Sequence, residues 1–122
     1  MRFMMIVKAT PDSEAGVMPP EKLIAEMAKY HEELQKAGVL LDASGLQPSS
    51  KGWRVKYLGS KRSVVDGPFS ETKEFLGGFN LIEAPDLDAA MAIAGEFPWA
   101  RFGSIEVRPV HDFEAERRRV GA

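Results

Sequence analysis

The sequence predicts a two-layer α+β domain in which two helices cover one face of an antiparallel sheet. Short apolar or alternating segments typical of strands recur along the chain, and two amphipathic segments with helical periodicity separate them. The predicted order is β-α-β-β-β-α-β, with a small extra ribbon in the middle. A chain of 122 residues suits one domain with its own core, so we expect a single domain over residues 1–122.

The first half of the chain contains the clearest strand and the clearest helix. Residues 2–9 form an apolar run bounded by charges, as in a buried strand. Residues 10–20 contain three prolines and a glycine, so we expect a loop there. Residues 21–38 are predicted to be a helix that ends at a glycine. Its apolar stripe consists of Leu23, Ile24, Met27, Tyr30, His31 and Leu34.

The second half supplies the remaining strands and the second helix. We expect a short strand broken at Ser44-Gly45, an alternating strand at residues 52–59, and further strands at residues 63–68, 75–84 and 104–110. Gly77-Gly78 fall inside one of them and are expected to mark a β-bulge rather than a ligand contact. A helix is predicted over residues 86–97 with Asp86 as N-cap, and the tail after residue 110 is expected to be a frayed helix.

This order predicts a ferredoxin-like arrangement, an antiparallel sheet with both helices on one face. The other face then has no cover, although the first strand is apolar on both sides: Phe3, Met5 and Val7 alternate with Met4 and Ile6. Proteins avoid exposing large apolar faces to water. We therefore expect a partner over the open face, most simply a second copy in a homodimer.

Composition excludes several classes of function. The chain has no cysteine, which rules out disulfides, thiolate nucleophiles and cysteine-based metal centres, and only two histidines, so no metal or other cofactor is expected. A net charge of −2 with both signs dispersed argues against direct binding to nucleic acid. No apolar segment approaches the roughly 20 residues of a membrane span, and a cytoplasmic location is expected.

The stretch "DGPFSETKEFLGGF" at residues 66–79 resembles the signature of the DGPF branch of the YCII-related proteins. The segments "AGVLLDASGLQPS" and "IEVRPV" are similar to other blocks of that family and occur in the same order. The resemblance implies a dimeric α+β barrel, in which two ferredoxin-like sheets pack face to face. Members of the DGPF branch often occur beside sigma factors of the extracytoplasmic-function type, which implies a regulatory alternative to catalysis.

YCII-related proteins are proposed to use a His–Asp pair in a cleft. His31, in "KYHEEL", resembles the family histidine. The family aspartate precedes a Pro-aromatic pair, and here that position is Phe97 in "FPW". The acid is therefore absent, which favours a non-enzymatic binding or regulatory dimer as the alternative function. The remaining candidate acid is Asp66 of the DGPF motif.

His31 and Asp66 are the candidate catalytic residues. A neutral imidazole, with a reference pKa of about 6.5, suits general-base work, but a histidine at the border of a helix can equally serve only to bond a neighbouring strand. Asp66 could orient His31 or act as a base itself, or it could simply close a turn before Gly67.

The cluster Glu71, Lys73 and Glu74 could hold a polar ligand, form a solvated loop, or pair across a dimer. The leading hypothesis is a small-molecule-binding dimer. Its enzymatic version is a cofactor-free enzyme of proton transfer or hydrolysis-like chemistry that uses His31 with Asp66. The alternative is a regulatory dimer linked to a sigma-factor system.

Overall fold

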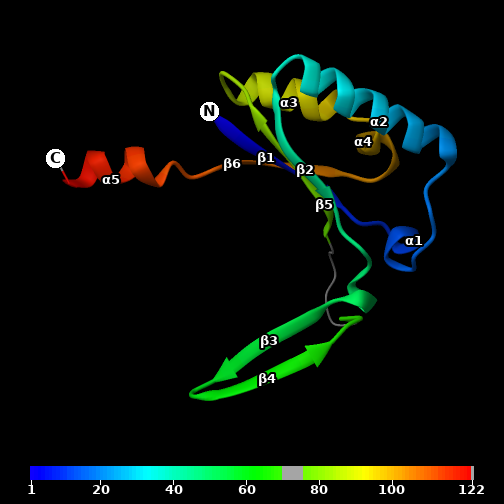
Figure 1. Cartoon of the computed structure of the whole chain (residues 1–122), viewed down its shortest axis with the longest axis vertical. Coiled ribbons are helices and arrows are strands. Elements are labelled where there is room, and N and C mark those ends of the chain that lie inside the picture. Colours follow the sequence, from blue (N-terminus) through cyan, green and yellow to red (C-terminus); the bar gives the residue numbers. More distant parts are fainter. Residues whose placement is uncertain (70–75, 122) are drawn as a thin grey trace.

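The computed structural model describes residues 1–69 and 76–121, and within them six strands and five α-helices follow one another (Figure 1). The elements are β1 (Arg2–Lys8), α1 (Pro11–Glu14), α2 (Glu21–Lys36), β2 (Leu40–Gly45), the 3-10 turn η1 (Ser49–Lys51), β3 (Trp53–Leu58), β4 (Lys61–Asp66), β5 (Leu76–Glu83), α3 (Leu87–Glu96), α4 (Trp99–Phe102), β6 (Ile105–Pro109) and α5 (Phe113–Gly121). None of the helices in these ranges is long and apolar enough to cross a membrane.

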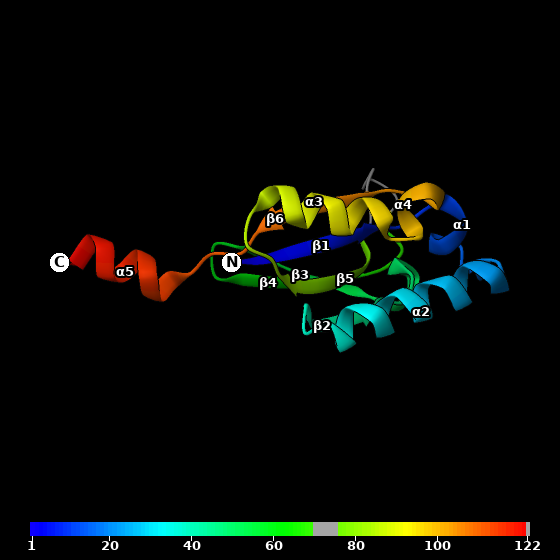
Figure 2. The same cartoon turned by 90° about the horizontal axis from the view of Figure 1, so that it is seen from above.

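Four of the strands form one antiparallel sheet in the order β2-β5-β1-β6. Helix α2 joins β1 to β2, and α3 lies between β5 and β6. Both helices cover the same face of the sheet (Figures 1 and 2). The predicted α+β class, with an antiparallel sheet and helices on one face, is confirmed, and the strand order is that of the ferredoxin-like arrangement.

The core lies between this sheet and the two helices. Alternation along β1 sends Phe3, Met5 and Val7 to the helical side, where the first two are completely buried. Ile82 of β5 and Phe97 at the end of α3 are the other two large side chains that are fully buried in this core. Leu23, Met27 and Tyr30 of α2 pack against this cluster, as the helical stripe predicted.

The opposite side of the sheet, here called the open face, carries an apolar strip. The register pairs Met4 with Leu81 and Ile6 with Phe79, so these four side chains lie together on that side. All four are partly exposed. Glu106 continues the row because it lies opposite Ile6 on β6.

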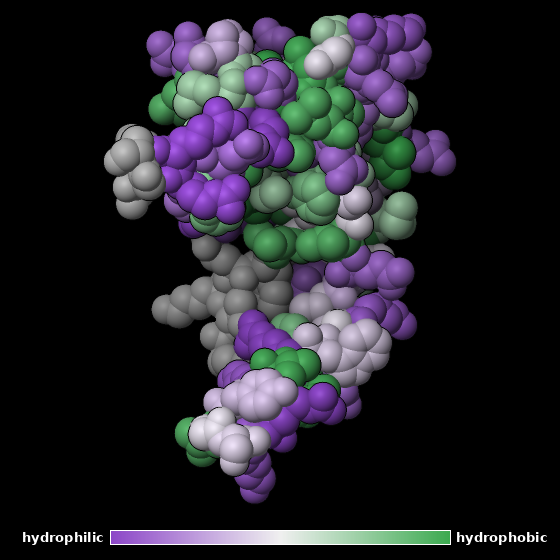
Figure 3. Space-filling model, turned by 60° about the vertical axis from the view of Figure 1, so that its left-hand side comes forward, coloured by the Kyte–Doolittle hydropathy of each residue, from purple (hydrophilic) through white to green (hydrophobic). Residues whose placement is uncertain are grey.

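Strands β3 and β4 form a separate two-stranded ribbon, here called the arm. The arm leaves the body between β2 and β5 and extends on the side of the sheet away from the helices (Figures 1 and 2). The space-filling view shows the arm projecting below the body (Figure 3). Helix α5 extends in another direction (Figure 1).

Three local predictions need correction. The segment 10–20 is not all loop, because α1 forms there: Thr10 is its N-cap, makes a reciprocal capping box with Ser13, and is followed by Pro11 at the first helical position. Ser44 and Gly45 continue β2 rather than breaking it. The short helix α4 follows Pro98 and was not predicted.

The bulge predicted at Gly77-Gly78 is confirmed. Val7 pairs with Gly78, whereas the next residue of β1, Lys8, pairs with Leu76, so Gly77 is the extra residue on β5. A Cβ on Gly78 would lie 2.6 Å from the backbone oxygen of Ser44, so the close approach of β2 requires glycine there.

Candidate functional site

His31 lies on α2 and points toward the sheet, where it meets a buried amide. Its Nε2 atom is 2.6 Å from the side-chain oxygen of Asn80 on β5. Asn80 is only 2% exposed and is the buried polar residue among the apolar side chains of the described core. A buried amide without a partner would cost about 1–3 kcal/mol, so this hydrogen bond stabilises the position of both side chains.

Aromatic rings fix the imidazole from a second direction. The ring of His31 meets Phe97 edge-to-face, with centroids 5.3 Å apart and an interplanar angle of 72°. Tyr30 makes a similar contact with Phe97 at 5.7 Å, and its hydroxyl donates a hydrogen bond of 2.8 Å to the carbonyl oxygen of Ile93. The residue at the position of the family acid is therefore an apolar wall beside the imidazole.

The surroundings of Tyr30 favour its neutral form. Burial, together with the negative charges of Glu96 and Glu33, raises the pKa of the Tyr30 hydroxyl above its ordinary value. Because Asn80 offers its carbonyl oxygen to His31, Nε2 carries the proton and Nδ1 is the basic nitrogen. The arrangement can thus accept a proton or a hydrogen bond at Nδ1.

A cavity of about 330 Å³ opens beside the pair. Its walls are mainly apolar side chains and backbone: Val7, Met27, His31, Ala43, Ser44, Gly45, Gly77, Gly78, Phe79, Asn80 and Phe97. The histidine and the amide are thus the convergent polar side chains of a largely apolar hollow, which is the usual character of a small-molecule site.

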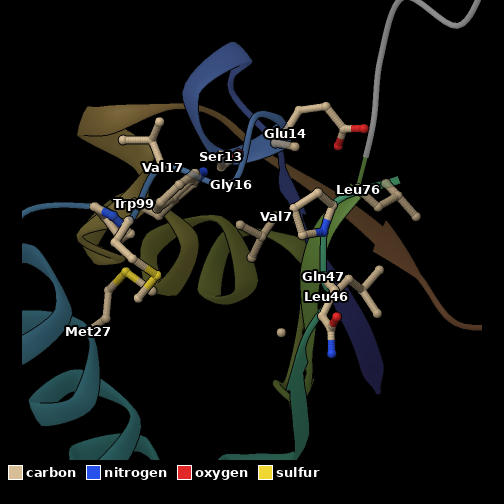
Figure 4. Close-up of a pocket in the computed structure, with 16 residues that line it drawn as sticks. Val7, Ser13, Glu14, Gly16, Val17, Met27, Leu46, Gln47, Leu76 and Trp99 are labelled. Atoms are coloured by element: carbon tan, nitrogen blue, oxygen red, sulfur yellow. The ribbon is translucent and has the colours of Figure 1, made fainter. Parts of the chain in front are cut away.

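A second cavity of about 420 Å³ adjoins the first and shares Val7, Met27, Gly45 and Gly77 with it. Figure 4 shows Met27 and Trp99 on one side and Leu46 with Gln47 on the other, with Val7 between them. The two adjacent hollows are together called the cleft, with the smaller one as its inner end. His31 lines this inner end.

The outer end of the cleft is built by bonds between distant segments. Glu14 of α1 accepts hydrogen bonds from the backbone N–H of Ser49, at 3.0 Å, and from the Ser49 hydroxyl. The Trp99 indole N–H donates to the carbonyl oxygen of Lys8 at 2.9 Å. Since Glu14 and Trp99 both line the larger cavity, these bonds fix its walls.

Asp66 is on the arm rather than on an element of this cleft. It is the last residue of β4 and lies opposite Trp53. Its side chain is exposed, and within residues 1–69 and 76–121 the structure gives its carboxylate no hydrogen bond. The hydrogen-bond partner of the His31 side chain is Asn80. The structure therefore brings His31 to an amide and does not join it to Asp66.

The glycine after Asp66 has a purely geometric role. Its N–H donates to the carbonyl oxygen of Gly52 at 2.9 Å, which closes the base of the arm. A Cβ on Gly67 would lie 1.7 Å from the backbone oxygen of Ser49, so no other residue fits without moving the η1 turn. The Asp-Gly corner is thus a tight backbone crossing.

Two further predictions concern ligands. Glu71, Lys73 and Glu74 lie outside the described residues. Across the described part of the chain, no group of three or more histidine, cysteine or carboxylate side chains is placed to hold a metal ion.

Comparison with known proteins identifies the family. The pattern of the YCII-related domain matches residues 1–114. The chain belongs to the YCII-related family. An uncharacterized relative, protein R00369 of Rhizobium meliloti (strain 1021), is 34% identical over 92 residues, which cover 74% of each chain.

A solved structure is similar to this YCII-related chain in fold. It is 5-chloro-2-hydroxyhydroquinone dehydrochlorinase (TftG) from Burkholderia phenoliruptrix AC1100, in complex with 2,5-dihydroxybenzoquinone. The TM-score is 0.54 at 17% identity, over 91% of this chain and 94% of that chain. At this identity the likeness concerns the fold alone.

Asn80 is the site residue that the sequence analysis missed. The signal was present, because an asparagine interrupts the apolar strand "FNLI" on the side that faces the helices. A buried polar side chain needs a partner, and a histidine on the covering helix is a suitable one. Which residue of α2 would meet it depends on the packing of two elements 49 residues apart.

Proposed function

We propose that this YCII-related protein binds a small, flat, largely apolar molecule in the cleft between α2 and the sheet. The observation that carries the proposal is the buried Asn80, which holds His31 at the inner end of an apolar cavity. A ligand with one hydroxyl or carbonyl group could bond to Nδ1 while its ring fills the space beside Phe97.

The chemistry we propose is cofactor-free proton transfer at His31. Nδ1 takes a proton from an acidic hydroxyl or an activated C–H of the ligand, and Asn80 holds the imidazole in the orientation for that step. An amide stabilises the resulting imidazolium less than a carboxylate does. The site therefore suits substrates that already carry an acidic proton, such as hydroxylated aromatic rings or hydroxyquinones. The similar structure bound to 2,5-dihydroxybenzoquinone supports this class.

Asp66 and the cluster Glu71, Lys73 and Glu74 remain parts of the proposal. We propose that this charged cluster contacts the ligand at the outer end of the cleft, where Leu76, the first described residue after it, lines the larger cavity. Asp66, as an orienting acid for His31, is tested by Asp66→Asn. An unchanged pH dependence of ligand binding in that variant would restrict Asp66 to the turn.

The experiment titrates parent and variants with 2,5-dihydroxybenzoquinone and follows the chemical shifts of the two histidine rings by NMR. We expect His31→Ala to weaken binding at least tenfold. His111→Ala is the matched control, because that histidine is exposed near the C-terminus and stacks on Phe113. Equal affinities of the two variants would place the ligand elsewhere or show that this class is wrong.

Asn80 offers a second arm of the same experiment. Asn80→Leu removes the acceptor and is expected to weaken binding while the ring of His31 loses its fixed orientation, which is visible as a changed Nε2 proton resonance. Asn80→Asp supplies a carboxylate instead and is expected to alter ligand affinity because its hydrogen bond to His31 becomes charge-assisted. If neither variant alters ligand binding, the buried amide is structural only.

The homodimer is the second proposal, and the open face supports it. Met4, Ile6, Phe79 and Leu81 form an apolar strip without a covering element in the described chain. Face-to-face pairing of two such sheets gives the dimeric α+β barrel expected for the DGPF branch. Sedimentation velocity at several concentrations tests it, and a monomer at every concentration contradicts it.

A regulatory function of that dimer is favoured by one observation, the phenylalanine at the position of the family acid. In this alternative the dimer binds a partner linked to a sigma factor of the extracytoplasmic-function type. Pull-down with purified candidates from neighbouring genes tests this alternative, and the absence of any specific complex counts against it.

A further inference from the structure

One face of the arm is mainly apolar, with Arg62 and Asp66 as its charged residues, and the other face is mainly polar. Cross-strand register pairs Val55 with Val64 and Tyr57 with Arg62, and the side chains of directly opposed residues share a face. Trp53 lies on this face as well, one alternation before Val55. The other face carries Arg54, Lys56, Leu58, Lys61, Ser63 and Val65.

The apolar face of the arm is uncovered. Trp53 is 69% exposed, Val55 58%, Tyr57 66% and Val64 51%. With aromatic side chains of about 150–250 Å² each, these four present roughly 400–500 Å² of apolar surface per chain. A patch of that size on a projecting ribbon is characteristic of an interaction site.

A free two-stranded ribbon is marginal in water, yet this arm is held firmly at its base. Gly67 bonds to Gly52, and Glu14 of the body bonds to Ser49. The guanidinium of Arg54 lies 3.9 Å from the ring centre of Phe69, which is 8% exposed. An arm that is fixed at its base and has an uncovered apolar face is suited to binding a partner.

We propose that the apolar face of the arm, defined by Trp53, Val55, Tyr57 and Val64, docks on the body of a second copy of this chain. The inference rests on the homodimer proposed above and adds that each protomer embraces the other with its arm. The arm extends on the side of the open face (Figures 1 and 2), so a second body placed against that face comes within its reach.

Area supports a second copy as the occupant. The four apolar side chains of the open face are already partly covered by their neighbours in the sheet, so they supply only a modest contact. Stable dimers bury about 1,200–2,000 Å² in total. Two arms contribute roughly 800–1,000 Å² of apolar surface on that scale, which makes up most of the deficit.

Charge supports the same occupant. Residues 53–66 contain four cationic side chains and one acid, whereas the rest of the chain contains twelve and seventeen. The arm therefore has a net charge of +3 and the remainder −5. A second copy offers the arm an acidic body, and long-range attraction of this kind guides docking.

The test measures the dimer dissociation constant by sedimentation velocity and light scattering. Trp53→Ser combined with Tyr57→Ser is expected to raise it at least 100-fold. Leu58→Ser is the matched control, since Leu58 is 87% exposed on the other face of the same ribbon, and is expected to leave it within threefold. Circular dichroism verifies that all three proteins are folded.

The outcomes separate the two proposals. A monomeric parent overturns both the dimer and the docking of the arm. A dimeric parent whose double variant keeps the parental dissociation constant overturns the arm alone and leaves the open-face dimer. Retention of the parent, but not of the double variant, on duplex DNA at moderate salt, with no change in dimer mass, assigns the arm to nucleic acid instead and also overturns the proposal.

A cross-linking experiment is independent of any loss of folding. A photoreactive phenylalanine analogue replaces Tyr57, and chains with normal and heavy nitrogen are mixed before irradiation. We expect cross-linked peptides that combine both isotopes, with the partner peptide from the body. Cross-links confined to single-isotope pairs within one chain contradict docking on a second copy.

Discussion

The glycine pair of β5 provides the sharpest test of how the sheet is built. A Cβ on Gly78 would meet the backbone oxygen of Ser44 at 2.6 Å, whereas ordinary contacts of a Cβ begin near 3.4 Å. A Cβ on Gly77 would find its nearest neighbour, the backbone oxygen of Val7, at 3.5 Å. Two adjacent residues of identical chemistry therefore differ in the space beside them, and Gly78 alone of the two has a positive φ, of 159°, which L residues rarely adopt.

The cost of Gly78→Ala follows from this geometry. Strand β2 must move by about 0.8 Å, the difference between the 2.6 Å contact and the 3.4 Å at which ordinary contacts begin. The obstacle is a backbone oxygen, which cannot rotate away as a side chain can. Overpacking of this kind costs about 1–3 kcal/mol, and weakening one ladder hydrogen bond adds about 1 kcal/mol. We expect Gly78→Ala to lower the free energy of unfolding by about 2–4 kcal/mol, or the Tm by roughly 8–16 °C for a domain of this size.

Gly77→Ala serves as the control. The contact at 3.5 Å is acceptable, and alanine restricts the unfolded chain, which offsets small losses in the bulge. We expect a change within about 0.5 kcal/mol. Urea denaturation followed by circular dichroism measures both variants. The reasoning fails if Gly78→Ala unfolds with the parental midpoint, or if Gly77→Ala loses as much stability as Gly78→Ala.

Three further predictions concern titration and capping. The raised pKa of Tyr30 means that the fold favours the neutral phenol. The contribution of Tyr30 to stability is therefore fully present below the ordinary value of 10.0 and is lost as pH rises above it. Tyr30→Phe should reduce this loss, measured as the difference between urea midpoints at about pH 7 and about pH 10.5. The pKa of Glu106 is lowered, first by its hydrogen bond from Arg108, so its contribution is present above the ordinary value of 4.5 and is lost in acid; Glu106→Gln should reduce the difference between midpoints at pH 6 and pH 3. Asp86→Ala removes the cap on the N–H of Ala89 and should cost about 1 kcal/mol in thermal unfolding, whereas Asp86→Asn should retain most of it.

Periodicity explains why most of the fold could be predicted. Helix α2 has a stripe at 3.6-residue spacing, and β1 is an apolar run of strand length, so each signal extends over many residues. The short helices lack that length. Helix α1 has four residues, and its start is encoded by a cap at Thr10 and a proline at N1, while the same proline also suggests a loop.

The candidate site was predictable only in part. The position of His31 on the sheet-facing stripe follows from the spacing of its own helix. Its partner does not, because Asn80 belongs to another element and the contact depends on how helix and sheet pack. The pairing of His31 with Asp66 stays a prediction. The reason for Gly67 is equally non-local, since the atom that excludes a side chain belongs to Ser49.

The arm and the cleft share their supports, which makes a link between assembly and ligand binding a physical consequence of the fold. Ser49 forms part of the arm base and bonds to Glu14, which lines the larger cavity. Leu46 lines the larger cavity and follows β2 on the segment that leads to the arm. Its N–H donates to the carbonyl oxygen of Gly77 on β5 at 2.9 Å. A force on the arm therefore acts on both walls of the outer cleft. Docking of the arm on a second copy should stabilise one arrangement of these walls, so ligand affinity should change with the dimer fraction.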